Sequence, residues 1–142
     1  MTQNFSSIDK GKSFQSLVRI ALMEKYNQSF EFEVAFPVGN PAKDHKFDLV
    51  SSNGEIIVKT KNYTWTESGN VPSAKLSVLN EAVFYLQHTP KGKTRIIVIN
   101  YDLNVKKNES LANYYVKTYK HLLDDVIVME YNQELCVLNE IR

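Results

Sequence analysis

Residues 46–61, KFDLVSSNGEIIVKTK, carry the strongest signals for the fold. Residues 46–51 are typical of a strand, and the Asn53-Gly54 pair that follows favours a tight turn because it tolerates positive φ. Residues 55–61 form the next strand, and its apolar start, Ile56-Ile57-Val58, is typical of a strand covered on both faces. The stretch therefore predicts a β-hairpin whose second strand lies inside a sheet.

The preceding segments extend this hairpin into a meander. Residues 11–26 carry apolar side chains at helical spacing, which predicts a first helix. Residues 29–36 (SFEFEVAF) alternate with a period of two, which predicts a strand with Phe30, Phe32 and Val34 on one side and a solvated opposite face. Residues 37–44, rich in Pro, Gly and Asn, are expected to form a loop. We expect the three strands to pair as an antiparallel meander.

The segments after the hairpin complete an α/β fold. We expect a polar loop at 62–72, a helix at 73–87, a buried strand at 94–101, a helix at about 109–123, and strands at 125–130 and 134–138 around a turn at 131–133. Cys136 alternates with apolar neighbours and is expected to be a small core residue. The order is αβββαβ followed by αββ. A strand–helix–strand passage implies a right-handed crossover and parallel pairing, so the fold predicted is a mixed sheet flanked by helices.

Composition narrows the class of protein. The 142 residues are 43% hydrophobic and 23% charged, which is ordinary for a globular chain and argues against disorder. Seventeen Lys and Arg against sixteen Asp and Glu give a net charge of +1, so any affinity for nucleic acid must come from a local patch. The single cysteine excludes an intrachain disulfide, and no Cys/His cluster indicates structural zinc.

Targeting signals are not visible in the sequence. The N-terminal segment MTQNFSSIDKGKS is polar and lacks the apolar core of a signal peptide. No run approaches the roughly 18 apolar residues of a membrane span. We expect a soluble, intracellular protein in the cytoplasm, with no membrane partner.

The hairpin also brings together residues with a chemical use. Asp48 lies in its first strand and Lys61 ends its second, so the turn places both near the same end of adjacent strands. A carboxylate there can hold a hard cation such as Mg²⁺ through oxygen, and a bound metal lowers the pKa of its water and stabilises charge on a phosphate. A neighbouring lysine can act on that water or stabilise the phosphate as a point charge. Taken alone, the pair is better explained as a plain cross-strand salt bridge.

The order of elements and these residues together resemble the PD-(D/E)XK nuclease superfamily, which includes restriction endonucleases and archaeal Holliday-junction resolvases. The matching pieces are FDLV with Asp48, the strand EIIVKTK ending in Lys61, and GKSFQ at the first helix. The resemblance covers about residues 11–101. It implies a restriction-endonuclease-like αβββαβ core within a single nuclease-like domain over 1–142, with a C-terminal αββ extension at about 102–142.

The chain departs from the superfamily's pattern at two acid positions. Lys59 stands where the second acid is expected, so the motif is KTK in place of (D/E)xK, and Gln15 stands where the first helix often carries Glu. A lysine at this place opposes metal binding by Coulomb repulsion. Either the site is inactive, or the acid comes from elsewhere in the chain. Glu81 on the following helix is then the first candidate, and Glu67 and Glu55 are weaker ones.

The resemblance implies a role for each site residue. Asp48 is expected to bind the metal, Mg²⁺ or Mn²⁺, and Thr60 to offer it a backbone carbonyl. Lys61 is expected to act at the attacking water, and Gln15 with Glu81 to complete the shell. Lys59 is then the residue that silences the site.

A basic, aromatic and hydroxyl-rich segment borders this position. Lysines and hydroxyls there can contact phosphate, and an aromatic ring can pack on sugar or base. The alternative is a loop whose aromatics, Trp65 above all, fold back onto the body of the protein. The candidate DNA-binding residues are Lys43, His45, Lys46, Asn62, Tyr63, Thr64, Trp65 and Lys75.

The function predicted is therefore a metal-dependent endodeoxyribonuclease, restriction- or resolvase-like, acting on DNA. A homodimer or higher homo-oligomer is expected, because one site per subunit cuts two strands most easily in pairs. The alternative is a module of the same fold without catalysis that binds DNA or a protein partner. Lys59 and Gln15 are the residues that separate the two hypotheses.

Overall fold

Six strands form one mixed sheet in the order β1-β2-β3-β4-β7-β8 in the computed structural model, which describes residues 7–142. The first six residues, for which the sequence predicts no signal peptide, lie outside the described residues. The elements are α1 Ser7–Tyr26, β1 Phe30–Val38, β2 Lys43–Ser51, β3 Ile56–Lys61, α2 Ser73–Gln87, β4 Thr94–Asn100, β5 Leu103–Asn104, β6 Glu109–Ser110, α3 Leu111–Tyr119, the 3₁₀ helix η1 Lys120–Leu122, β7 Ile127–Asn132 and β8 Val137–Glu140.

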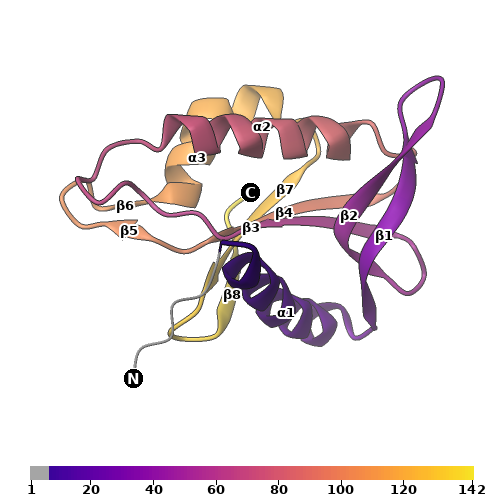
Figure 1. Cartoon of the computed structure of the whole chain (residues 1–142), viewed down its shortest axis with the longest axis horizontal. Helices are drawn as coiled ribbons and strands as arrows, with labels where there is room; N and C mark the ends of the chain where they lie inside the picture. Colours follow the sequence, from indigo (N-terminus) through magenta and orange to yellow (C-terminus); the bar gives the residue numbers. More distant parts are fainter. Residues whose placement is uncertain (1–6) are drawn as a thin grey trace.

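The pairing of the strands confirms the predicted α/β topology. β1, β2 and β3 form the antiparallel meander, and β3, β4 and β7 run parallel to one another. β8 closes the other edge by pairing antiparallel with β7. Figure 1 shows α2 and α3 on one face of this sheet and α1 on the other, so the central strands are covered on both sides.

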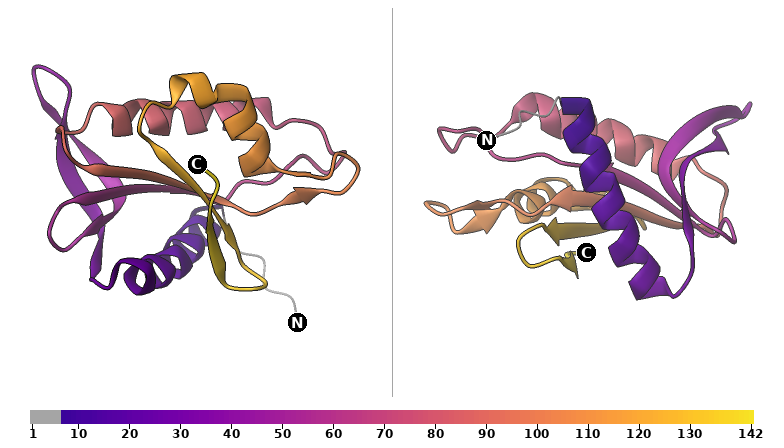
Figure 2. Two further views of the ribbon diagram at one scale, coloured as in Figure 1. Left: turned by 180° about the vertical axis from the view of Figure 1, so that it is seen from behind. Right: turned by 60° about the horizontal axis from the view of Figure 1, so that its bottom comes forward.

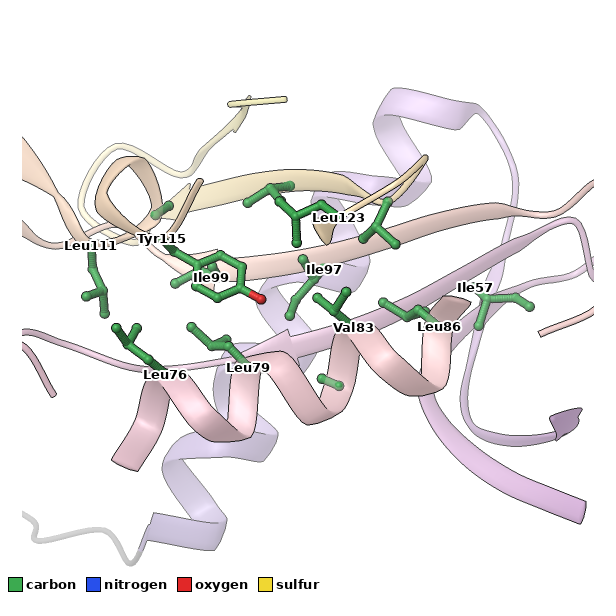
Figure 3. Close-up of a cluster of buried hydrophobic side chains, with 14 of the residues drawn as sticks. Ile57, Leu76, Leu79, Val83, Leu86, Ile97, Ile99, Leu111, Tyr115 and Leu123 are labelled. Atoms are coloured by element: carbon green, nitrogen blue, oxygen red, sulfur yellow. The ribbon is translucent and has the colours of Figure 1, made fainter. Parts of the chain in front are cut away.

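Two apolar cores separate the helices from the sheet. On one face Leu79, Val83 and Leu86 of α2 pack towards Ile97 and Ile99 of β4 (Figure 3). On the other face α1 contributes three buried side chains, Phe14, Val18 and Leu22. The predicted burial of residues 56–58 is confirmed, because β3 lies between β2 and β4 and meets both cores.

The three helices occur where the sequence predicts them, but the lengths of α1 and α3 differ from the prediction. α2 has the expected bounds, whereas α1 begins at Ser7, before the predicted start at residue 11. α3 is shorter than predicted: it begins after Ser110, whose hydroxyl accepts a hydrogen bond from Asn113 N–H at 3.1 Å, and its last turn tightens into η1. No helix within residues 7–142 has the length and apolar character that a membrane crossing requires.

The prediction of one apolar face along β1 is wrong. Phe30 packs in the core under α1, whereas Val34 packs against the core under α2, and Phe32 is 42% exposed. The change of face occurs at Glu33, which has a φ of 53°. A left-handed residue turns the strand about its axis, so the alternation of inward and outward side chains is reset there.

The C-terminal hairpin also differs from its prediction. The turn lies at residues 133–136, later than the expected 131–133, because Asn132 Oδ1 accepts hydrogen bonds from the N–H groups of Glu134 and Leu135 at 3.0 Å each. Cys136 is therefore an exposed turn residue with a φ of 53°, and the prediction that it is buried is wrong.

Two hairpins project from opposite ends of the sheet, as both views of Figure 2 show. One is the β1–β2 hairpin, in which β1 ends at Val38 and β2 begins at Lys43, so half of the predicted loop over 37–44 is strand. The other is the short β5–β6 ribbon, which lies in a stretch where no strands were expected. The segment between β3 and α2 lies beside this ribbon, where Asn104 donates to the Gly69 carbonyl, and it carries four of the eight predicted binding residues.

Candidate functional site

Asp48 lies inside the predicted site with one oxygen engaged by the backbone. Its Oδ2 accepts a hydrogen bond from Thr60 N–H at 2.7 Å, and the Thr60 hydroxyl lies 3.5 Å from the same oxygen. Burial raises the pKa of this carboxyl, and the Thr60 N–H together with Lys59 and Lys61 opposes the rise. Within the described residues no ion pair joins Asp48 to Lys61, so the plain cross-strand salt bridge is not formed.

Gln15 joins Asp48 to Glu33, an acid that the alternation of residues 29–36 places on the predicted solvated face. The buried Gln15 donates from Nε2 to the backbone carbonyl of Asp48 at 2.9 Å and to Oε1 of Glu33 at 3.3 Å. β1 pairs with β2 in an unbroken register on both sides of this point, with Phe32 opposite Leu49 and Val34 opposite Phe47. The left-handed Glu33 thus lies beside Asp48 on the neighbouring strand.

Lys59 is held in a fixed position next to these acids. Its Nζ lies 2.8 Å from Nε2 of His45 and 3.3 Å from the carbonyl oxygen of Lys46. An ammonium has no acceptor, so Lys59 donates and His45 accepts, which places the imidazole proton on Nδ1. The His45 ring in turn stacks on Tyr85 of α2, with the ring centroids 3.7 Å apart and 7° between the planes.

Burial and neighbouring charges shift the pKa values of Lys59 and His45. Burial lowers the pKa of the Lys59 ammonium, and the carboxylates of Asp48, Glu33 and Glu81 oppose that change. Burial likewise lowers the pKa of His45, and the neighbouring Lys59 lowers it further. A neutral imidazole is therefore favoured beside the cation.

A cleft of about 580 Å³ opens at the carboxyl end of β3. Three of its lining residues are lysines, Lys10, Lys61 and Lys75, and none is acidic. Asn62 joins its two walls through a 3.5 Å hydrogen bond from Nδ2 to the Lys10 carbonyl. The cleft is lined by Lys10, Gly11, Thr60, Lys61, Asn62, Tyr63, Thr64 and Lys75.

Some predicted binding residues lie outside this cleft. Trp65 is 6% exposed, and its Nε1 donates to the Asp102 carbonyl at 3.0 Å, so its ring packs inside the protein. Lys43 pairs with Val38 near the tip of the β1–β2 hairpin, whose Gly39 N–H bonds to the carbonyl of His88 after α2. It therefore lies at the other end of α2 from Lys75.

The fold places the three candidates for the second acid, Glu81, Glu55 and Glu67, in different surroundings. Glu81 on α2 is within electrostatic reach of His45 and Lys59. Glu55 lies at the far end of β3, where its carboxylate contacts Lys93 at 3.5 Å. Glu67 is exposed in the loop before α2. Glu33 was not predicted at all, because no feature of its neighbours distinguishes it from Glu31.

The donors present do not fit a magnesium site. Mg²⁺ requires near-octahedral oxygen coordination, which carboxylates anchor in proteins. Here Asp48 Oδ2 is engaged by Thr60, and the charged residue of β3 that acts most strongly on this carboxyl is the cation Lys59. Over residues 7–142 no three His, Cys, Asp or Glu side chains gather as a group able to hold a metal ion.

Comparisons with known proteins support the fold. No protein-family model matches the chain, and no curated protein matches it. An XisH family protein from Nostoc punctiforme is similar in structure, with a TM-score of 0.52 and 18% identity over 91% of this chain and 98% of that one. An FdxN element excision controlling factor protein from Anabaena variabilis has a TM-score of 0.54 and 15% identity, over 92% and 99% of the two chains. At these identities the likeness establishes a common fold.

Proposed function

We propose that this protein binds DNA through the cleft at the carboxyl end of β3 and that, with Lys59 in place of an acid, it does not cut DNA by a metal-dependent reaction. The observation that carries the proposal is the lining of the cleft, which holds Lys10, Lys61 and Lys75 without an acidic residue. Such a lining favours phosphate groups, which dominate the affinity of proteins for nucleic acid.

The remaining lining residues suit a sugar-phosphate backbone. Asn62 and the exposed Thr64 offer amide and hydroxyl groups, which are common ligands of phosphate oxygens. The Lys75 ammonium lies 5.4 Å from the centre of the Tyr63 ring, so the aromatic wall also holds a cation at the rim. An element excision controlling factor among the similar structures is compatible with a role at DNA.

The test compares the DNA affinity of variants that remove one lysine each. We expect Lys61→Gln and Lys75→Gln to weaken binding of a fluorescent duplex about tenfold each, the effect of losing roughly 1.4 kcal/mol of a charge-assisted contact. Lys91→Gln is the matched control, since Lys91 is an exposed lysine in the turn between α2 and β4. Equal affinities for all four proteins contradict the proposal.

A metal-dependent endonuclease is the second candidate function. One observation favours it: Gln15, Asp48 and Thr60 are joined by hydrogen bonds beside Lys61. What this arrangement lacks is the second acid, whose position Lys59 occupies. If the function is nuclease, Lys59 is the change that silences it.

A supercoiled-plasmid assay with Mg²⁺ and then Mn²⁺ separates these candidates. We expect no cleavage by the protein as it stands, because a lysine in the second acid position repels a divalent cation. Cleavage by the Lys59→Glu variant alone supports an inactivated nuclease site. Cleavage by the unaltered protein that Asp48→Ala abolishes establishes the second candidate and contradicts the first.

A further inference from the structure

The side chain of Lys59 is fixed by its surroundings to a degree unusual for a surface lysine. Besides the hydrogen bonds to His45 and Lys46, its Nζ lies 5.3 Å from the centre of the Phe47 ring and 6.0 Å from that of Tyr85. Cation–π contacts and a neutral imidazole acceptor both stabilise a positive charge. The fold thus holds a cation at this place.

Acids surround this cation without contacting it. Asp48, Glu33 and Glu81 all act electrostatically on Lys59, and no ion pair of Lys59 occurs within the described residues. Glu33 has a left-handed backbone at this position, and its carboxylate accepts a hydrogen bond from Gln15. Strained backbone of this kind persists where the surrounding structure demands it.

The cation is also close to the DNA cleft. Thr60 and Lys61, the next two residues of β3, both line the cleft. Residues two apart in a strand point to the same face, so Lys59 and Lys61 share one side of β3. Without a nearby cation, the carboxylates of Asp48 and Glu33 repel an approaching phosphate. A positive charge beside them removes that repulsion.

We propose that the Lys59 ammonium takes the place of a divalent cation, neutralising Asp48 and Glu33 so that the chain holds DNA phosphate without metal. This inference rests on the proposed DNA-binding function. It differs from that function in stating what Lys59 does and in identifying Glu33, in place of Glu81, as the second acid of the site.

The experiment measures the affinity for a fluorescent DNA duplex in EDTA and in Ca²⁺ at matched ionic strength. The unaltered protein is expected to bind equally in both, within about twofold. Lys59→Glu is expected to lose at least about tenfold in EDTA and to recover to within about threefold in Ca²⁺, because the metal then supplies the missing charge. Lys91→Glu makes the same charge change away from the cleft and is expected to lose less than about threefold, with no recovery.

A second pair of variants tests Glu33. Added to Lys59→Glu, the Glu33→Gln change is expected to abolish most of the recovery in Ca²⁺, whereas Glu31→Gln leaves it intact. Glu31 is an exposed residue of the same strand with ordinary backbone, so the two changes are chemically matched. Lys59→Gln, which adds no acid, is expected to show the same calcium dependence to a smaller extent and covers the case that Lys59→Glu does not fold.

The outcomes distinguish the two proposals. Failure of the unaltered protein to bind DNA at low salt contradicts the proposed function. Binding by the unaltered protein, together with a Lys59→Glu or Lys59→Gln loss that Ca²⁺ does not restore, contradicts only the cation replacement. A calcium-dependent affinity of the unaltered protein also contradicts it.

Discussion

Burial in the folded protein disfavours the ionised form of the Asp48 carboxyl. Burial raises the pKa of its carboxyl, so the folded state holds the proton more tightly than the unfolded state does. Stability from such a group is present at low pH and is lost as the pH rises from the ordinary pKa of 3.8 through the raised folded value. At neutral pH the ionised carboxylate therefore destabilises the fold.

The variant Asp48→Asn is expected to be more stable than the unaltered protein at pH 7 by about 1 kcal/mol, or a few °C in Tm. The amide oxygen can still accept the Thr60 N–H, while the buried charge is removed. The gain is expected to shrink as the pH falls through the raised pKa of the native carboxyl, because the carboxyl then becomes protonated. Thermal melts across this range check it, and a variant that is less stable at every pH contradicts this account of Asp48.

His45 gives a pH dependence in the opposite direction. Its pKa is lowered by burial and by Lys59, so the unfolded state binds the proton more tightly than the folded state does. Stability is expected to fall as the pH drops below the ordinary value of 6.5. His45→Gln is expected to flatten this part of the profile. The measurement is urea unfolding between pH 5 and 8, and an unchanged slope in the variant rejects His45 as its source.

Strand β1 stores strain at Glu33. A φ of 53° is unfavourable for a residue with a Cβ and costs glycine little. Glu33→Gly is therefore expected to be more stable than Glu33→Ala by about 1 kcal/mol.

The same two changes at Glu31 provide the control. There the backbone is that of an ordinary strand, so glycine is expected to be less stable than alanine by roughly 0.5–1 kcal/mol. Chemical denaturation of the four variants gives both comparisons. If alanine is the more stable residue at both positions, the left-handed turn at Glu33 is refuted.

The connection between α2 and β4 depends on one buried arginine. Arg95 is 8% exposed and donates to the Thr89 hydroxyl and carbonyl, the Pro90 carbonyl and Asp125. A lysine keeps the charge but loses the planar fork, so Arg95→Lys is expected to cost about 2 kcal/mol.

A partly exposed ion pair serves for comparison. The half-buried Lys93 contacts the exposed carboxylate of Glu55 at 3.5 Å, and Lys93→Met is expected to change the stability by less than about 0.5 kcal/mol. Denaturant unfolding of both variants is the measurement. Equal losses argue that the buried hydrogen bonds of Arg95 contribute no more than a surface pair.

The parts of the site that the sequence predicts are those fixed by local signals. The Asn53-Gly54 turn and the apolar run before Lys59 determine the hairpin, and the hairpin brings Asp48 to Thr60. The helix at 73–87 follows from its apolar period.

Other parts depend on contacts between distant segments and leave no local signal. Trp65 is buried because its N–H groups bond to Asp102, 37 positions later. Glu33 carries no glycine or asparagine signature for its left-handed backbone, so the strand pattern conceals both its change of face and its nearness to Asp48. The turn at Cys136 depends likewise on a side chain, Asn132, that the alternation of residues does not reveal.

The molecule as a whole is nearly neutral, with a net charge of +1, and its proposed DNA-binding charge is local. Three cleft lysines, Lys10, Lys61 and Lys75, come from the start of α1, the end of β3 and the start of α2. The fold brings these separated segments to one end of the sheet. A small patch of lysines predicts DNA binding that is weakened by salt. Because few phosphates are contacted, few counterions are released from the DNA.

The salt dependence of DNA affinity shows whether DNA phosphate binds to the lysines of this cleft. The measurement is a titration of duplex DNA in EDTA at several salt concentrations. Three phosphate contacts predict a slope of about −3 for the logarithm of affinity against that of salt, reduced to about −2 in Lys61→Gln. Absence of binding at low salt, or a slope that Lys61→Gln leaves unchanged, contradicts a DNA site in this cleft.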